Sequence, residues 1–96
     1  MYIINITYKV SLTVVDEYLK EHVVYLNEQY KLGNFHASGR KNPRVGGIIL
    51  SKISDKEKLE NIIAKDPFKL NDVANYELIE FIPTKTCDEL QFLAEE

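Results

Sequence analysis

The chain has few of the features that mark secreted or membrane-spanning proteins. It has no tryptophan and a single cysteine, Cys87, which cannot form a disulfide within the chain. Its apolar runs, such as "GIIL" at residues 47–50, are far shorter than the roughly 18 to 20 residues that cross a bilayer. The opening "MYIINITYKV" lacks the basic start and apolar core of a secretory signal. We therefore expect a soluble protein of the reducing cytoplasm.

Positively charged residues are also in short supply. Twelve Lys and Arg residues are outnumbered by fifteen Asp and Glu residues, which gives a net charge of -3. No overall field therefore favours a nucleic acid or an anionic membrane as partner. The glycine-rich patterns of nucleotide-binding loops do not occur in the sequence, and we expect neither a nucleotide nor another cofactor.

The sequence does contain enough apolar residues for one folded domain. Hydrophobic residues make up 45% of the 96 residues and charged residues 28%, a balance typical of globular rather than disordered chains. A chain of this length buries one core but not two. We expect a domain over residues 1–83, with residues 84–96 as a helical extension of the same domain.

The first third of the chain predicts a strand followed by a long helix. Residues 2–9, "YIINITYK", are β-branched and aromatic, and they alternate between two faces. A helix over about 12–32 follows, with Thr13 and Asp16 as a capping-box-like pair and Gly33 placed to end it. Its predicted apolar stripe, at helical spacing, consists of Leu12, Val15, Leu19, Val23, Leu26 and Tyr30.

The rest of the chain predicts a hairpin, a helix, a strand and a short terminal helix. The hairpin pairs about 35–40 with 46–52 around the turn-rich, basic "RKNPRVG". The capping signature "SDKE" opens a helix over about 55–65, which Pro67 ends. "PFKLNDVAN" predicts an irregular turn, "YELIEFI" at 76–82 a fourth strand, and the pattern from Thr86 to Glu89 a short helix.

This order of elements is that of a ferredoxin-like βαββαβ fold of the α+β class. It places four antiparallel strands in one sheet with both helices on one face. The strands carry apolar side chains on both faces, so the uncovered face would be a larger apolar patch than monomers usually expose. We expect a homodimer in which the two sheets face one another.

His22 is the candidate site residue that the helix pattern itself singles out. It lies three residues after Leu19 and four before Leu26, on or beside the apolar stripe. One interpretation is a partly buried histidine held by a backbone carbonyl. The other is a general acid or base whose second ring nitrogen is held by a carboxylate. Asp66 is the candidate carboxylate, although an Asp before a Pro is also a common turn initiator. Because His22 is about ten residues into its helix, roughly 15 Å along the axis, the sequence leaves direct contact between His22 and Asp66 open.

Several motifs together resemble one family. The helical histidine and terminal glycine of "EHVVYLNEQYKLGNFHASG", the "GG" before the third strand, "AKDPF" and "YELIEF" are similar in order and spacing to the YciI-like (YCII-related) proteins. The resemblance, over about residues 1–83, implies a dimeric α+β barrel and a site built on His22 and Asp66. It also implies lyase-like removal of a leaving group from a cyclic, often phenolic substrate, or isomerase-like proton transfer.

Other residues are candidates beside this pair. Ser38, Arg40 and Tyr8 are candidates for substrate binding, and Arg40 stands where family members often carry a proline. The basic residues around Arg40 could attract an anion or form a solvated surface. His36 and His22 lack the carboxylates or cysteines of a convincing metal site, and Cys87 lacks an activating partner. The hypotheses are a proton-transfer enzyme with a small-molecule substrate, a binding or regulatory module without turnover, and a structural dimer within a larger assembly.

Overall fold

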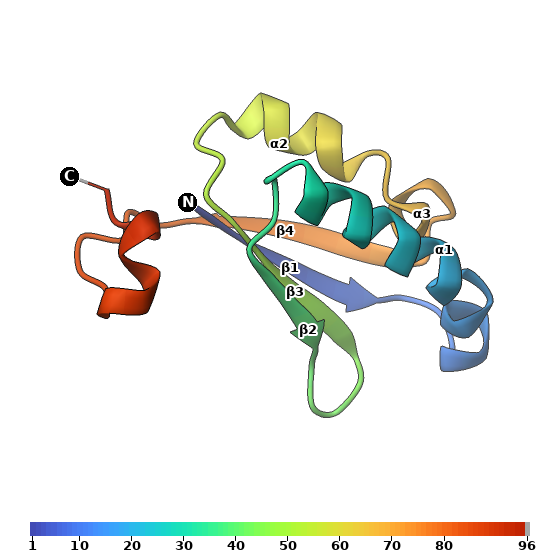
Figure 1. The fold of residues 1–96 in the computed structure, drawn as a ribbon. Helices are drawn as coiled ribbons and strands as arrows, with labels where there is room; N and C mark the ends of the chain where they lie inside the picture. Colours follow the sequence, from blue (N-terminus) through green and yellow to red (C-terminus); the bar gives the residue numbers. More distant parts are fainter. Residues whose placement is uncertain (96) are drawn as a thin grey trace.

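The computed structural model describes residues 1–95 and has the predicted ferredoxin-like order of elements (Figure 1). The strands form one antiparallel sheet in the order β2-β3-β1-β4. Helices α1, α2 and α3 lie on the same face of this sheet, and α1 and α2 run antiparallel (Figure 1). The elements are β1 (Tyr2–Tyr8), α1 (Leu12–Lys31), β2 (Ala37–Arg40), β3 (Gly46–Ser51), α2 (Lys56–Ile63), α3 (Pro67–Leu70), β4 (Ala74–Glu80) and the 3-10 helix η1 (Asp88–Leu93).

The main core lies between the sheet and the helices. Ile4 of β1 is fully buried and pairs in register with Ile49 of β3 and Leu78 of β4. Leu59 of α2 and Phe35, before β2, complete the same cluster. Burial of such side chains contributes about 1.5 to 3 kcal/mol each, and the alternation of β1 fixes which of its side chains face the helices.

The predicted apolar stripe of α1 was wrong in part. Val15 is buried as expected, but Leu12 and Val23 are 43% and 44% exposed. The buried residues of this helix are instead Val15, His22, Tyr25 and Gln29. The polar members are tolerated there because they have partners: the Gln29 side-chain carbonyl accepts a hydrogen bond from Asn34 at 2.8 Å.

The helix caps also differ from the prediction. Ser11, rather than the pair Thr13 and Asp16, caps α1, and its hydroxyl accepts a 3.4 Å hydrogen bond from the Val14 amide. Asp55, rather than Ser54, caps α2. Ser11 and Asp55 each have the extended backbone that a cap requires. Their side-chain oxygens are as suitable as those of the residues predicted to cap these helices. Gly33, by contrast, has the predicted left-handed conformation, with φ of 76°.

The segment predicted as an irregular turn contains α3. Asp66 caps this short helix and Pro67 occupies its first turn, where a proline's fixed φ is compatible with a helix and its missing N–H costs nothing. The tail forms the 3-10 helix η1, and Cys87 precedes it without a side-chain cap, so the capping pattern from Thr86 to Glu89 was misleading. The N-terminal ammonium fastens the tail through a 2.9 Å ion pair with Glu95.

The sheet face opposite the helices is covered by no helix of residues 1–95 (Figure 1). Ile3 pairs with Leu50 and with Ile79 across this face, and Ile79 is 43% exposed. Below them Asn5 donates a 3.0 Å hydrogen bond to Glu77. A second copy on this face remains a prediction. Among the described residues, no helix combines the length and the apolar character that a membrane span requires.

Candidate functional site

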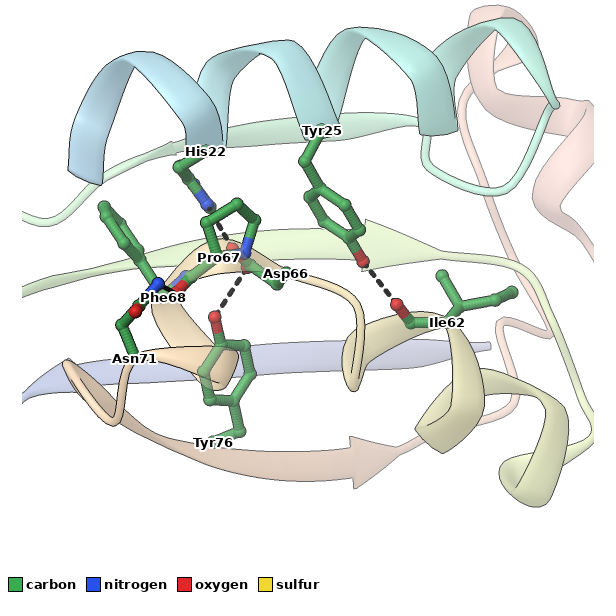
Figure 2. A network of polar contacts seen from close by, with 8 residues as sticks. All are labelled: His22, Tyr25, Ile62, Asp66, Pro67, Phe68, Asn71 and Tyr76. Carbon is green, nitrogen blue, oxygen red and sulfur yellow. Dashed lines mark hydrogen bonds and ion pairs between the residues drawn. The ribbon is translucent and has the colours of Figure 1, made fainter.

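His22 and Asp66 are in direct contact beneath α1. The His22 Nδ1 atom lies 2.7 Å from Asp66 Oδ1 (Figure 2), and the two residues are only 8% and 1% exposed. The contact left open by the sequence is made because α2 is short. Its eight residues extend about 12 Å, so an antiparallel α2 ends opposite the middle of α1, where His22 lies.

The Asp66 carboxylate accepts hydrogen bonds from three directions. Oδ1 accepts from the Phe68 amide at 3.0 Å, in the helix-capping geometry, and Oδ2 accepts from the Tyr76 hydroxyl at 2.6 Å (Figure 2). An ionised carboxylate is purely an acceptor, so the third donor is His22 Nδ1–H. In the neutral form of the imidazole this bond selects the tautomer with the proton on Nδ1, which leaves a lone pair on Nε2.

Aromatic packing holds the imidazole ring in place. The rings of His22 and Phe68 are stacked, with centroids 4.0 Å apart and planes inclined by 6°. Tyr8 approaches the edge of Phe68 with centroids 5.9 Å apart. One helical turn beyond His22, the Tyr25 hydroxyl donates a 2.8 Å hydrogen bond to the Ile62 carbonyl (Figure 2). The hydrogen bond to Asp66 therefore fixes the direction of the His22 ring within its plane, and stacking on Phe68 restrains the plane from rotating.

The phenol of Tyr76 remains a hydrogen-bond donor to Asp66 at physiological pH. Burial raises the pKa of the Tyr76 hydroxyl far above its ordinary value, and the negative charge of Asp66 raises it further. Burial, followed by the charge of Asp66, likewise raises the pKa of Tyr25. Neither phenol provides a proton for acid-base chemistry near neutral pH, and Tyr76 stabilises the carboxylate instead.

A cavity of about 170 Å³ lies beside the pair, and His22 forms part of its wall. An engineered cavity of comparable size, about 150 Å³, holds a benzene molecule. Tyr8, Ser38 and Arg40 also line the cavity, so four of the five predicted site residues surround one space, with Asp66 behind His22. The apolar walls come from Ile6, Leu19, Val23, Leu26, Ile49 and Phe68, among others.

Strand β2 supplies the polar side of the cavity. Ser38 and Arg40 are alternate residues of this strand and therefore share a face. The Ser38 hydroxyl lies 2.6 Å from that of Tyr30 on α1. Arg40 is exposed and forms no ion pair with any other residue of 1–95. Its guanidinium is thus available to an anionic or carbonyl oxygen at the cavity mouth.

The rest of the basic hairpin tip serves the protein's own structure. Arg44 pairs with Asp16 of α1 at 2.5 Å, and Lys41 donates a 3.2 Å hydrogen bond to Thr7. A β-carbon at Gly46 would lie 1.8 Å from the Ile6 carbonyl oxygen. This glycine therefore permits β3 to approach β1, which accounts for it without a ligand.

Two residues of the site were missed by sequence reasoning. Tyr76 belongs to "YELIEF" and Phe68 to "AKDPF"; both motifs contribute to the family resemblance, but "YELIEF" was otherwise used only as a strand signal and Phe68 was placed in an irregular turn, so neither residue was given a role. Each could have been suspected only by placing Asp66 at a helix cap, since that position brings Phe68 and β4 to its carboxylate.

The remaining candidates lie elsewhere. The His36 ring packs against Phe92 of η1, with centroids 5.5 Å apart, and burial, followed by the charge of Lys52, lowers the pKa of His36. Cys87 is exposed. Within the described part of the chain, no three metal-binding side chains gather at one place.

Comparisons with known proteins agree with this fold. A similar solved structure is 5-chloro-2-hydroxyhydroquinone dehydrochlorinase (TftG) from Burkholderia phenoliruptrix AC1100, in complex with 2,5-dihydroxybenzoquinone. The TM-score is 0.71 over 86% of this chain and 95% of that one, at 13% sequence identity, so the likeness is one of fold. A search of curated proteins gives no match. Residues 1–82 match the model of the YCII-related domain, and the chain therefore belongs to this family.

Proposed function

We propose that the protein is a small-molecule enzyme in which His22, oriented by Asp66, transfers a proton on a ring-containing phenolic or carbonyl substrate. The observation that carries the proposal is the division of labour between the two ring nitrogens. Nδ1–H is bound to a buried carboxylate, while Nε2 has no hydrogen-bond partner within residues 1–95 and belongs to a side chain that lines the cavity. This is the arrangement of a general base.

In the proposed mechanism, His22 Nε2 accepts a proton from a C–H or O–H group of the substrate. The resulting imidazolium is stabilised by Asp66, whose carboxylate is itself held by Phe68 and Tyr76. In a lyase-like reaction the electrons of the broken bond form a double bond as the leaving group departs with its own electron pair. In an isomerase-like reaction, Nε2 returns the proton to another atom of the substrate.

Substrate binding is assigned to Arg40, Ser38 and Tyr8. The cavity, at about 170 Å³, suits one six-membered ring between apolar walls. Arg40 would hold an oxygen that is negatively charged or becomes so, and the hydroxyl groups of Ser38 and Tyr8 would hold neutral oxygens. The ring-shaped ligand of the dehydrochlorinase with this fold supports a small cyclic substrate.

The active form is proposed to be a homodimer joined through the uncovered sheet face. Ile3, Leu50 and Ile79 present an apolar row there, which a second copy would remove from water. A single, exposed Cys87 is consistent with a reducing cytoplasm.

The test is a panel of hydroxylated six-membered ring compounds, with and without chloride as leaving group. Wild type is incubated with each in D₂O, and both chloride release and exchange of ring protons are followed. For a compound that reacts, His22→Ala should lower the rate by about 10² to 10⁴, whereas Val24→Ala, on the exposed side of α1, should not. Equal rates in wild type and His22→Ala would refute the mechanism. Saturable binding with no reaction for any compound would favour a binding module.

A further inference from the structure

We propose that Tyr76 is a positioning residue of this site, which sets how strongly Asp66 holds the proton of His22. This inference rests on the proposed function, because it concerns the same pair. It assigns a task to a residue of β4 to which neither the family resemblance nor the sequence pattern gave a role.

The geometry separates the two oxygens of Asp66. Oδ1 serves His22 and the Phe68 amide, whereas Oδ2 accepts only the Tyr76 hydroxyl, at 2.6 Å, among residues 1–95. Such a short bond to a carboxylate is of the charge-assisted kind, which is about twice as strong as a neutral one. Tyr76 extends from β4 and His22 from α1, so their side chains approach the Asp66 carboxylate from opposite sides (Figure 2).

The surroundings of Tyr76 favour its role as a permanent donor. Tyr76 pairs in register with Ile6 of β1, and the Lys69 ammonium lies 5.3 Å from the centroid of the Tyr76 ring. Burial keeps the hydroxyl protonated, as its raised pKa indicates. The titratable and charged groups around the Asp66–Tyr76 contact, from all elements packed there, are Tyr8 of β1, His22 and Tyr25 of α1, Lys56 and Glu60 of α2, and Lys69 of α3.

The chemical consequence follows from charge sharing. Each donor to a carboxylate stabilises its negative charge and makes it a weaker acceptor toward the next donor. While Tyr76 donates to Oδ2, Asp66 still orients His22 but attracts its imidazolium less strongly. The imidazolium can therefore pass its proton on to the substrate. Without the Tyr76 hydroxyl, more of the negative charge of Asp66 acts on His22 Nδ1–H. The His22–Asp66 pair should then take up its proton at a higher pH.

The experiment compares Tyr76→Phe with Tyr25→Phe. Both variants remove one partly buried tyrosine hydroxyl that donates to a protein acceptor, but of the two only the Tyr76 hydroxyl donates to Asp66. The titration of each histidine ring is followed by NMR with ¹⁵N-labelled histidine, and His36, whose ring packs against Phe92, is the internal reference. Tyr76→Phe should move the His22 titration midpoint upward by about 0.5 to 1 pH unit, while Tyr25→Phe leaves it within about 0.2.

A purely structural Tyr76 would lower the midpoint of urea unfolding in Tyr76→Phe but leave the His22 titration unchanged. That result, or an equal shift in the two variants, would overturn the proposal. The readout requires no substrate, so a protein without turnover still tests it. If the His22 titration shifts as expected and His22→Ala nevertheless retains full activity, the proposed function fails and the role of Tyr76 in the pair stands.

Discussion

Replacing Asp66 by alanine should destabilise the protein far more than the loss of an ordinary helix cap. The substitution leaves three donors without their acceptor: the buried His22 Nδ1–H and Phe68 amide, and the partly buried Tyr76 hydroxyl. A buried donor left unpaired costs about 1 to 3 kcal/mol. Water entering the vacated space would offset part of this, so the expected loss is roughly 3 to 5 kcal/mol out of a total stability of about 5 to 15.

Asp55→Ala is the matched control for the capping part of this effect. Asp55 caps α2 through one exposed hydrogen bond to the Lys58 amide, at 3.2 Å, so its removal should cost about 1 kcal/mol. Urea unfolding of wild type and the two variants is followed by far-UV circular dichroism at one protein concentration, because dimerisation would make stability depend on concentration. A loss in Asp66→Ala within about 1 kcal/mol of that in Asp55→Ala would refute the reasoning.

Three further predictions concern other parts of the molecule. Arg40→Ala should weaken binding of benzoate in the cavity by roughly tenfold, measured by calorimetry. Lys41→Ala should change this affinity little, because the Lys41 ammonium already donates to Thr7. Burial lowers the pKa of His36, so the unfolded chain binds that proton first and stability should fall as the pH drops below about 6.5; in His36→Asn the thermal midpoint should fall less between about pH 7.5 and 5.5. Ile79→Lys on the uncovered sheet face should yield monomers in analytical ultracentrifugation, whereas Val24→Lys, on the exposed side of α1, should not; an unchanged mass for Ile79→Lys would argue against that interface.

The fold could be predicted because two signals are strong in this sequence: the alternation of side chains along the strands and the residues that mark where helices end. Ile4 and its neighbours in β1 specify a buried face by alternation alone, and Gly33 marks the end of α1 by the conformation it permits. Details decided by competition between adjacent residues could not be predicted. Ser11 and Asp55 cap their helices although the nearby Thr13 and Ser54 offer equivalent oxygens. The backbone conformation in the folded protein decides which of these residues becomes the cap.

The site was predictable only in part, for a reason of geometry. The helix pattern suggested His22, the Asp-Pro pair suggested Asp66, and the family resemblance supported both, but their contact depends on where α2 ends relative to α1, which tertiary packing decides. Arg40 and Ser38 share a face by strand alternation, and this was available from the sequence. Tyr76 and Phe68 carry no chemical signal in their own segments, since a strand tyrosine and a loop phenylalanine are most often packing residues.

The measurement that tests the central claim most directly is the turnover of His22→Gln relative to wild type on a ring compound that the wild type converts. Glutamine retains a polar side chain of similar reach but cannot accept a proton as imidazole does. The account predicts a rate lower by about 10² to 10⁴, with an unchanged circular dichroism spectrum and oligomeric state. A folded His22→Gln protein that turns over at the wild-type rate would contradict it.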